Sequence, residues 1–409
     1  MTVATIKLSE TTKFIVDNRG KTVPTSDTGI PLIATNCIDN RNLYPVYEKL
    51  RYVSQETYDN WFRSHPKPMD IILTLKGSQN GAVNLVPDPV DFCIAQDMVA
   101  LRIDESKIDP LYLFAVLRSE EIQDQIKTLD VSGVIPHFKK SDFDKLEIPL
   151  PDRQLQEFLG RTYFDLCKKI DLLHRQNKTL EAMAETLFRQ WFIEEAKEDW
   201  EETTLERHII ALKGLSYKGS GLCDIGQGVP MFNLNSILEG GGYKTKGLKY
   251  YKGDYKERHI VKAGDIIIAN TEQGHEHRLI GFPATIPSYF SGESIFTHHI
   301  FKVSLLEDTY LSNEFIYYLL CSSSVREQIT GATNGSTVNQ LAADGLRRPK
   351  FKLPPQKLVE SFTDQVTSFW YKRDLNQQQV WLLEKLRDTL LPKLMSGEVR
   401  VEYKKVDAA

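Results

Sequence analysis

The sequence predicts an α+β protein in which two mixed α/β domains are separated by two long helices that form an antiparallel coiled coil, arranged as a tandem repeat with pseudo-two-fold symmetry. Three observations predict this class: the chain matches itself at a shift of 203 residues, each copy ends in a heptad pattern, and each copy carries short β-branched segments. The predicted order is domain 1–150, helix 151–195, domain 196–350, helix 351–400 and tail 401–409.

The repeat is clearest at the end of each copy. At the shift of 203 residues, Leu150-Pro151 falls on Leu353-Pro354 and Thr186-Leu187 falls on Thr389-Leu390, without a gap between these points. Each half of the chain therefore consists of a variable block followed by a similar helical block.

Each variable block contains signals for strands and helices. Residues 70–75 and 265–269 are β-branched runs bounded by glycine and proline, which predicts strands. Asp109 precedes Pro110, and Ser312 precedes a second apolar segment, so both residues are expected to cap helices. The order of the strands does not follow from these signals.

The helical blocks carry a heptad seam. Eleven positions from Gln156 to Trp191 step alternately by three and four, and nine of them are apolar; 203 residues later, Val359 to Leu394, eight of eleven are apolar. This periodicity is typical of a coiled coil. The alternative, in which each helix packs separately on its own domain, stays open.

Polar residues interrupt the seam near its middle. Pairing the two helices end to end in antiparallel orientation brings Asn177 near Arg373 and Asn376. We expect these three residues to share a central polar layer, because polar groups inside an apolar seam fix its register.

Composition narrows the classes of function. The 55 acidic and 51 basic side chains give a formal charge of −4, which argues against a uniformly basic DNA-wrapping or membrane-binding protein. The five cysteines form no C-x-x-C motif, so neither a disulfide framework nor a zinc knuckle is supported. No apolar run reaches the ~18 residues of a membrane span. The expectation is a cytoplasmic protein without a membrane partner.

The sequence contains no complete motif of a known catalytic or metal site. Gly242 and Gly247 have the glycine spacing of a phosphate-binding loop, but Leu248 stands where that loop needs lysine. The histidines at 275, 277, 298 and 299 are not accompanied by other residues at the spacing of metal ligands, so no metal is expected. We therefore assign no catalytic residue.

Two polar loops after the predicted strands carry groups that bond base edges. The candidates are Lys76, Ser78, Gln79 and Asn80 in the first copy, and Gln273, His275, His277 and Arg278 in the second. The alternative is that these are ordinary solvated turns.

A basic segment gives a further candidate surface. Residues 213–262 hold nine basic and four acidic side chains with interleaved tyrosines, a composition typical of phosphate contact. Its candidate DNA-binding residues are Lys218, Tyr243, Lys244, Lys246 and Lys249.

The helical segments also resemble a known family. Residues 150–154, 169–177, 179–183 and 187–192 resemble the central conserved region of Type I restriction-modification specificity subunits. Residues 353–356 and 390–400 resemble the C-terminal one. The resemblance covers nearly the whole chain, whereas the variable blocks have no family motif to match.

The resemblance implies a non-catalytic subunit of a restriction endonuclease and adenine methyltransferase complex. Each variable block would be a target-recognition domain for one half of a split sequence in double-stranded DNA, with the helices as a ruler for the gap. DNA methyltransferase subunits, expected to be two, and translocase-nuclease subunits would bind. They would carry S-adenosylmethionine, ATP and Mg²⁺, with no cofactor on this chain. The alternatives are a stand-alone restriction enzyme with built-in specificity and a coiled-coil scaffold without a DNA role.

Overall fold

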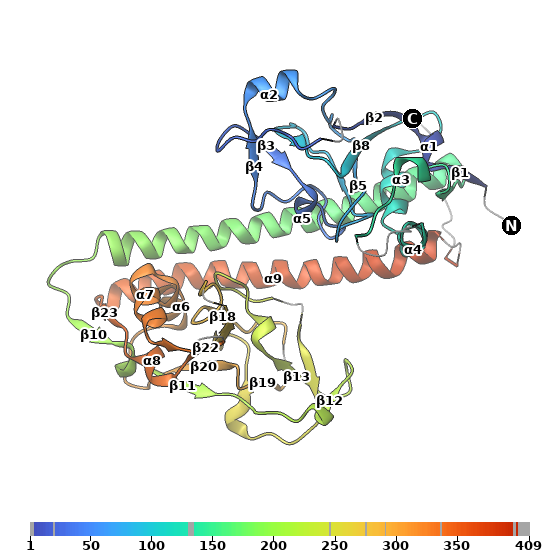
Figure 1. Ribbon diagram of the computed structural model, residues 1–409. Helices are drawn as coiled ribbons and strands as arrows, with labels where there is room; N and C mark the ends of the chain where they lie inside the picture. The colour runs from blue at the N-terminus through green and yellow to red at the C-terminus, as the bar shows by residue number, and fades with distance from the viewer. Residues whose placement is uncertain are drawn as a thin grey trace, which may run out of the picture. The chain divides into compact units, whose positions relative to one another are not determined.

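The computed structural model describes residues 4–18, 21–129, 135–244, 247–274, 276–290, 292–335, 338–395 and 398–399. The chain divides into two compact units: unit 1 is Met1–His174 with Val380–Ala409, and unit 2 is Arg175–Gln379. Two long helices, α5 (Arg153–Arg189) and α9 (Gln356–Met395), each contribute to both units (Figure 1). A π-helical turn, Gln190–Glu194, ends α5.

Unit 1 is built on two small sheets and a terminal strand pair. The strands run in the order β2-β8-β5-β6 in the larger sheet and β4-β3-β7 in the smaller one, and β1 pairs with β9. Their bounds are β1 Thr5–Lys7, β2 Thr12–Val16, β3 Ile30–Ile33, β4 Arg51–Val53, β5 Ile71–Thr74, β6 Val83–Leu85, β7 Cys93–Ile94, β8 Met98–Ile103 and β9 Glu147–Pro149. The short helices are α1 Leu8–Thr11, α2 Gln55–Asn60, α3 Pro110–Leu117 and α4 Glu120–Thr128.

Unit 2 repeats this plan and adds strands. The larger sheet is β11-β20-β16-β18, the second sheet is β12-β14-β13-β19-β15, a third is β17-β22-β21, and β10 pairs with β23. The strand bounds are β10 Glu202–Thr204, β11 Ile209–Lys213, β12 Leu222–Cys223, β13 Val229–Phe232, β14 Lys249–Tyr251, β15 Ile260–Val261, β16 Ile266–Ala269, β17 Thr271–Gln273, β18 Pro283–Thr285, β19 Ser294–Phe296, β20 Ile300–Leu305, β21 Thr333–Asn334, β22 Val338–Leu341 and β23 Lys350–Lys352. The short helices are α6 Asn313–Cys321, α7 Ser323–Gly331 and α8 Ala343–Arg347.

Matching strands in the two units begin with the same polar anchor. Asp70, before β5, accepts a hydrogen bond from the backbone of Lys67 at 2.8 Å and pairs with Arg102 of β8 at 2.8 Å. Asp265, before β16, accepts from the backbone of Lys262 at 2.8 Å and pairs with Lys302 of β20 at 2.7 Å. The central strand of each larger sheet is therefore fixed by an equivalent aspartate.

The helix caps lie where the sequence predicts them. The Asp109 carboxylate accepts from the Tyr112 backbone N–H at 2.8 Å, with Pro110 in the first turn of α3. The Ser312 hydroxyl accepts from the Phe315 backbone N–H at 3.1 Å at the start of α6. Both helices carry some of the largest fully buried side chains of their unit, Tyr112 and Phe114 on α3 and Phe315 on α6.

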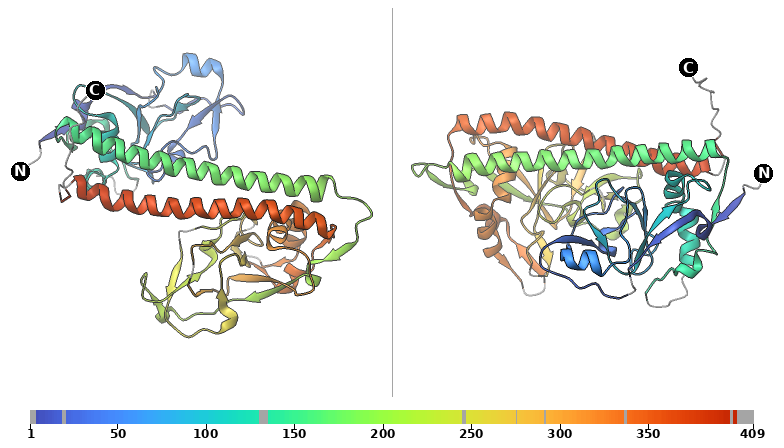
Figure 2. Two further views of the ribbon diagram at one scale, coloured as in Figure 1. Left: turned by 180° about the vertical axis from the view of Figure 1, so that it is seen from behind. Right: turned by 90° about the horizontal axis from the view of Figure 1, so that it is seen from above.

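The long helices pair in antiparallel orientation inside each unit. In unit 1, Ile170 and Leu173 of α5 form a buried cluster with Val380 and Leu383 of α9. In unit 2, Phe188 of α5 contacts Phe362 of α9, with ring centroids 5.8 Å apart. Figure 2 shows from two further directions that the parts of α5 and α9 within each unit run alongside each other.

The seam of unit 2 contains a buried amide pair. The Asn376 side chain, 1% exposed, donates from Nδ2 to Asn177 Oδ1 at 2.9 Å, and Asn177 donates from Nδ2 to the Arg373 carbonyl oxygen at 3.3 Å. Arg373 contributes only its backbone to this layer, because its guanidinium donates to Thr285 Oγ1 at 2.9 Å. The two amides satisfy each other inside the apolar seam, so this register leaves fewer polar groups unpaired than a shifted one.

The buried stripe departs from the predicted heptad toward the helix ends. Cys167 is buried in place of Leu166, and Phe188 and Phe192 are buried in place of Leu187 and Trp191. The reason is that these turns also pack against the domain of their unit, where Phe192 contacts Phe315 of α6 at 5.0 Å. Each helix thus packs on its partner and on a domain, which combines the two interpretations of the sequence.

None of the helices in the described part of the chain has both the length and the apolar character that a bilayer crossing requires.

We predict that replacing one amide of the buried pair costs more than replacing both. Asn376→Leu leaves the Asn177 oxygen without its donor, so the free energy of unfolding should fall by about 1–3 kcal/mol. The double substitution Asn177→Leu with Asn376→Leu restores an apolar layer and should be more stable than either single variant. Urea unfolding followed by circular dichroism measures this, and purely additive losses would contradict the coupling.

Candidate nucleic-acid interface

The three-stranded sheet β17-β22-β21 presents an outer face in unit 2 that is polar apart from the exposed Val338. Thr271 lies opposite Gln340, and Gln340 lies opposite Asn334 in the next strand. Because residues that face each other in a ladder point to the same side, these three side chains share one face. Gln340 and Asn334 are exposed there, together with Gln273 at the end of β17. We call this set, Thr271, Gln273, Asn334 and Gln340, the β22 face.

A buried carboxylate fixes the opposite side of the sheet. Glu272, 8% exposed, accepts backbone N–H bonds from Arg278 at 2.9 Å, Leu279 at 3.2 Å and Ile280 at 2.9 Å. Asn339, also buried, donates to the Gly274 carbonyl oxygen at 2.6 Å. The segment after β17 is therefore held by its backbone, which leaves outward side chains free for other contacts.

A buried guanidinium completes this anchoring. Arg326 of α7 donates to the carbonyl oxygens of Ile280 at 2.6 Å and His277 at 3.0 Å. Its guanidinium carbon lies 3.7 Å from the Phe282 ring centroid. The loop is thus bound through its N–H groups by a carboxylate and through its carbonyl groups by a cation.

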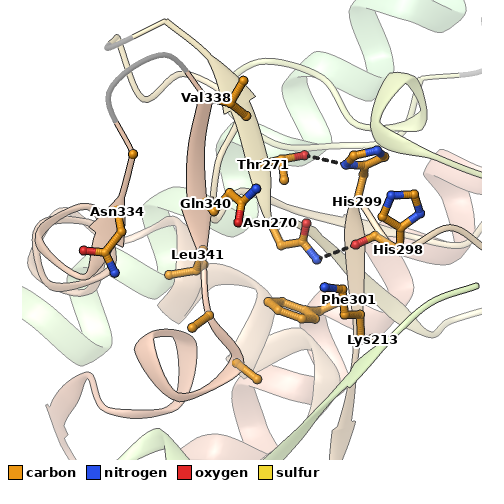
Figure 3. A pocket seen from close by; sticks show the side chains of 13 residues that line it. Lys213, Asn270, Thr271, His298, His299, Phe301, Asn334, Val338, Gln340 and Leu341 are labelled. Atoms are coloured by element: carbon orange, nitrogen blue, oxygen red, sulfur yellow. Dashed lines mark hydrogen bonds between the residues drawn. The ribbon is translucent and has the colours of Figure 1, made fainter. Parts of the chain in front are cut away.

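The β22 face opens into a pocket of about 800 Å³ (Figure 3). The lining includes Thr271, Asn334 and Gln340 of the face, together with Lys213, Asn270, His298 and His299. Among the described residues that line it, none is acidic. The pocket thus offers amide and imidazole groups beside a lysine, a combination that suits nucleic acid better than a cation.

The two histidines have different environments. His299 bonds Thr271 Oγ1 through Nδ1 at 3.1 Å, and His298 has its Nδ1 buried without a hydrogen-bond partner in the described structure. Partial burial lowers the pKa of His299, and the nearby His298, Lys213 and Lys249 lower it further. His299 is therefore neutral near pH 7. Thr271 bonds its Nδ1, so its Nε2 is the ring nitrogen left for another contact.

Unit 1 has the same hydrogen-bonded frame with different side chains. After β5, Leu75 N–H donates to the Asp97 carbonyl at 2.8 Å, and Phe138 N–H donates to the Leu75 carbonyl at 2.8 Å. In unit 2, Asn270 N–H donates to the His299 carbonyl at 3.1 Å and Leu341 N–H donates to the Asn270 carbonyl at 2.9 Å. The bridge between Lys76 and His137 in unit 1 thereby corresponds to the pairing of Thr271 with Gln340.

The predicted loop of unit 1 lies beside this bridge. Ser78 is exposed, and Lys76 and Gln79 are partly buried. Asn80 instead has a structural contact, because its Oδ1 accepts from the Phe138 backbone N–H at 3.1 Å. The structure thus brings Lys76 together with His137, a residue that the loop analysis missed.

The predicted loop of unit 2 is in part a strand. Residues 271–273 form β17, and Thr271 and Glu272 are buried, because the polar sequence pairs with β22. Gln273 and Arg278 are exposed, and Arg278 pairs with Glu276 at 2.8 Å. His277 is half-buried and has a positive φ of 49°. His275 lies outside the described residues.

The basic segment is less uniform than its composition suggests. Lys218 and Lys244 are exposed, whereas Lys249 donates to the Tyr217 hydroxyl at 3.0 Å. Tyr243 does not fit the predicted phosphate contact, because its hydroxyl is buried and its ring packs against Phe290 with centroids 6.1 Å apart. Burial also raises the pKa of the Tyr243 hydroxyl. Lys246 lies outside the described residues.

Asn334, Gln340 and His137 are candidate contacts that were not predicted from the sequence. The repeat could have indicated two of them, because His137 and Gln340 occupy equivalent positions, 203 residues apart. Within the described part of the chain, no group of three or more histidine, cysteine or acidic residues forms a potential metal site.

Comparison with known proteins finds similar chains. Residues 15–182 match the family model described as the Type I restriction modification DNA specificity domain. The Type I restriction enzyme MjaIX specificity subunit of Methanocaldococcus jannaschii is 26% identical over 314 residues, covering 71% of this chain and 69% of the relative. The chain is thus similar in sequence to Type I specificity subunits over most of its length.

Further relatives span most of the chain. The Type I restriction enzyme HindI specificity subunit of Haemophilus influenzae is 21% identical over 402 residues, covering 81% of this chain and 87% of the relative. The crystal structure of a Type I restriction-modification system S subunit from M. genitalium has a TM-score of 0.60 at 16% identity and covers 96% of each chain. The family resemblance and the α+β class read from the sequence are therefore confirmed. The relatives' names as specificity subunits agree with a non-catalytic role.

Proposed function

We propose that this chain is the DNA-specificity subunit of a Type I restriction-modification complex and that each unit reads one half of a split target. The observation that carries the proposal is the hydrogen-bonded frame shared by the two units. It holds Lys76 and His137 in unit 1 where it holds Thr271 and Gln340 in unit 2. A conserved frame with different donors and acceptors is what two readers of different sequences require.

The chemistry of the two sets differs in the expected way. Lysine bonds the acceptor groups of guanine, whereas glutamine pairs with both the donor and the acceptor of adenine. Exposed lysines, including Lys218 and Lys244, would contact phosphates and supply affinity that falls with salt.

The long helices suit the role of a ruler. Helix α5 runs for 37 residues without a break. At 1.5 Å per residue such a helix is roughly 56 Å long. Half-sites on one face of B-DNA lie about 34 Å apart, a separation that a flexible linker could not hold constant.

Exposed apolar residues at repeated positions provide docking surfaces for the methyltransferase subunits. Leu172 of α5 and Leu375 of α9 are 39% and 41% exposed, and Met183 and Leu386 are 45% and 47% exposed. Each pair is related by the shift of 203 residues, and the two positions on each helix are three turns apart on one side. Two equivalent surfaces fit two methyltransferase subunits, with translocase-nuclease subunits joining for restriction. S-adenosylmethionine, ATP and Mg²⁺ would belong to these partners.

Exchange of one domain should change one half of the target. We expect that replacing residues 1–150 by the corresponding block of a specificity subunit with another target alters the first half-site and leaves the gap and the second half-site unchanged. Methylation mapping in a host that carries the complex measures this. The reciprocal exchange of residues 196–350 is the control, and a change in both half-sites from either exchange would contradict the modular arrangement.

Lengthening both helices should widen the gap. Three heptads inserted after His174 in α5 and after Gln379 in α9 add about 32 Å to each helix, close to one turn of B-DNA. The mapped gap should grow by about nine base pairs at the DNA rise of ~3.4 Å. Insertion into α9 alone is the control, because it leaves the helices mismatched and should abolish assembly. An unchanged gap after the double insertion would refute the ruler.

Charge on the apolar positions should remove methyltransferase subunits one at a time. Leu375→Glu should weaken one docking site by about 10- to 100-fold, the equivalent of losing one buried leucine. Adding Leu172→Glu should remove the second subunit. Analytical ultracentrifugation would then give two, one and no bound subunits for the parent, single and double variants. Leu375→Met is the matched control and should keep both, whereas full assembly of the double variant would place docking elsewhere.

A further inference from the structure

We propose that the β22 face enters the major groove and that Gln340 reads an adenine-containing base pair in the half-site of unit 2. This inference rests on the proposed DNA-specificity function and names the element and the residue that carry it. Of the loop candidates from the sequence, Gln273 alone belongs to this face, and the assignment of Gln340 does not depend on it.

The geometry of the strands puts the amides in a row. In the ladder, Asn334, Gln340 and Thr271 lie directly across from one another on three neighbouring strands. His299 extends this row through its 3.1 Å bond to Thr271 (Figure 3). The major groove is wide enough to admit a two-stranded β-ribbon, and several DNA-binding proteins read bases with strands.

The burial pattern distinguishes a side chain that can contact bases from the side chains that hold the sheet in place. Gln340 is exposed, whereas its neighbours Asn339 and Leu341 are 4% and 3% exposed. Asn339 is bonded to Gly274, and Glu272 on the same side holds three backbone N–H groups. The sheet is therefore ordered before DNA binds, so that docking costs little loss of backbone entropy.

The chemistry of Gln340 selects the base. A glutamine side chain offers one acceptor and one donor edge, which matches the N6 donor and N7 acceptor of adenine in the major groove. Lys213 is an exposed residue of the same lining, whose described residues include no acidic side chain, and it is suited to a phosphate beside that base. His299 is exposed, and its Nε2, which Thr271 does not use, is suited to the neighbouring base pair.

The test uses the full chain in complex with its methyltransferase subunits. Once the target is mapped, binding is measured at two salt concentrations to duplexes that vary each base pair of the target in turn. Gln340→Ala should lower the discrimination at one adenine-containing pair of the unit 2 half-site by about 5- to 100-fold, the worth of one bidentate contact. The unit 1 half-site should stay unchanged.

A second substitution tests the assignment by changing which base is preferred instead of removing the preference. Glutamate accepts hydrogen bonds but cannot donate, so Gln340→Glu should shift the preference at that position from adenine toward cytosine. Gln227→Ala is the matched control, because Gln227 is exposed in unit 2 but outside the pocket lining, and it should change nothing. Thermal unfolding of each variant should match the parent, since Gln340 lies on the surface.

Two results would overturn the inference. One is an equal loss of binding to all duplexes with a shallower salt dependence, which would make Gln340 a phosphate neighbour. The other is unchanged discrimination at every position of the unit 2 half-site. Failure of the proposed function differs from both, because the parent complex would then show no preference among the duplexes.

Discussion

The structure depends on one constraint: the core of each unit is completed by the beginning of one long helix and the end of the other. In unit 1, Tyr163 of α5 and Leu394 of α9 belong to the same buried cluster as the domain helices. In unit 2, Phe192 of the π-helical turn that follows α5 and Phe362 of α9 do the same, with ring centroids 5.2 Å apart. Because both cores draw on both helices, moving either helix would expose apolar surface in each unit. The amide pair Asn177–Asn376 then fixes the register that these contacts require.

Much of the fold could be predicted because its signals are local or periodic. The long helices follow from the heptads, and the starts of α3 and α6 follow from Asp109 and Ser312, whose side chains bond the first turn. Strand order could not be predicted, because β2 pairs with β8 and β11 pairs with β20 across long stretches of chain. The heptad pattern predicted the wrong buried residues toward the helix ends, because burial there depends on the domain as well as on the partner helix. Phe188, for example, is buried where the heptad predicts Leu187.

The candidate interface was less accessible to sequence reasoning. The loops after β5 and β16 were found because polar residues follow buried strands. Gln340 was missed because β22 is four residues long and half polar, a pattern that resembles a turn until its pairing with β17 is known. Tyr243 was misassigned for the converse reason: its basic neighbours indicated a surface, although its ring completes a core with Phe232.

The support of the β22 face by Glu272 and Arg326 has a consequence for how such a protein diversifies. The carboxylate and the guanidinium bind backbone groups of the adjoining loop rather than outward side chains. An exchange of side chain at an outward position therefore carries little penalty in folding. Under the proposed function, a lineage could acquire a new target by single substitutions on this surface. Changes at Glu272 or Arg326 would be removed by selection, so variability and conservation should alternate along one short strand pair.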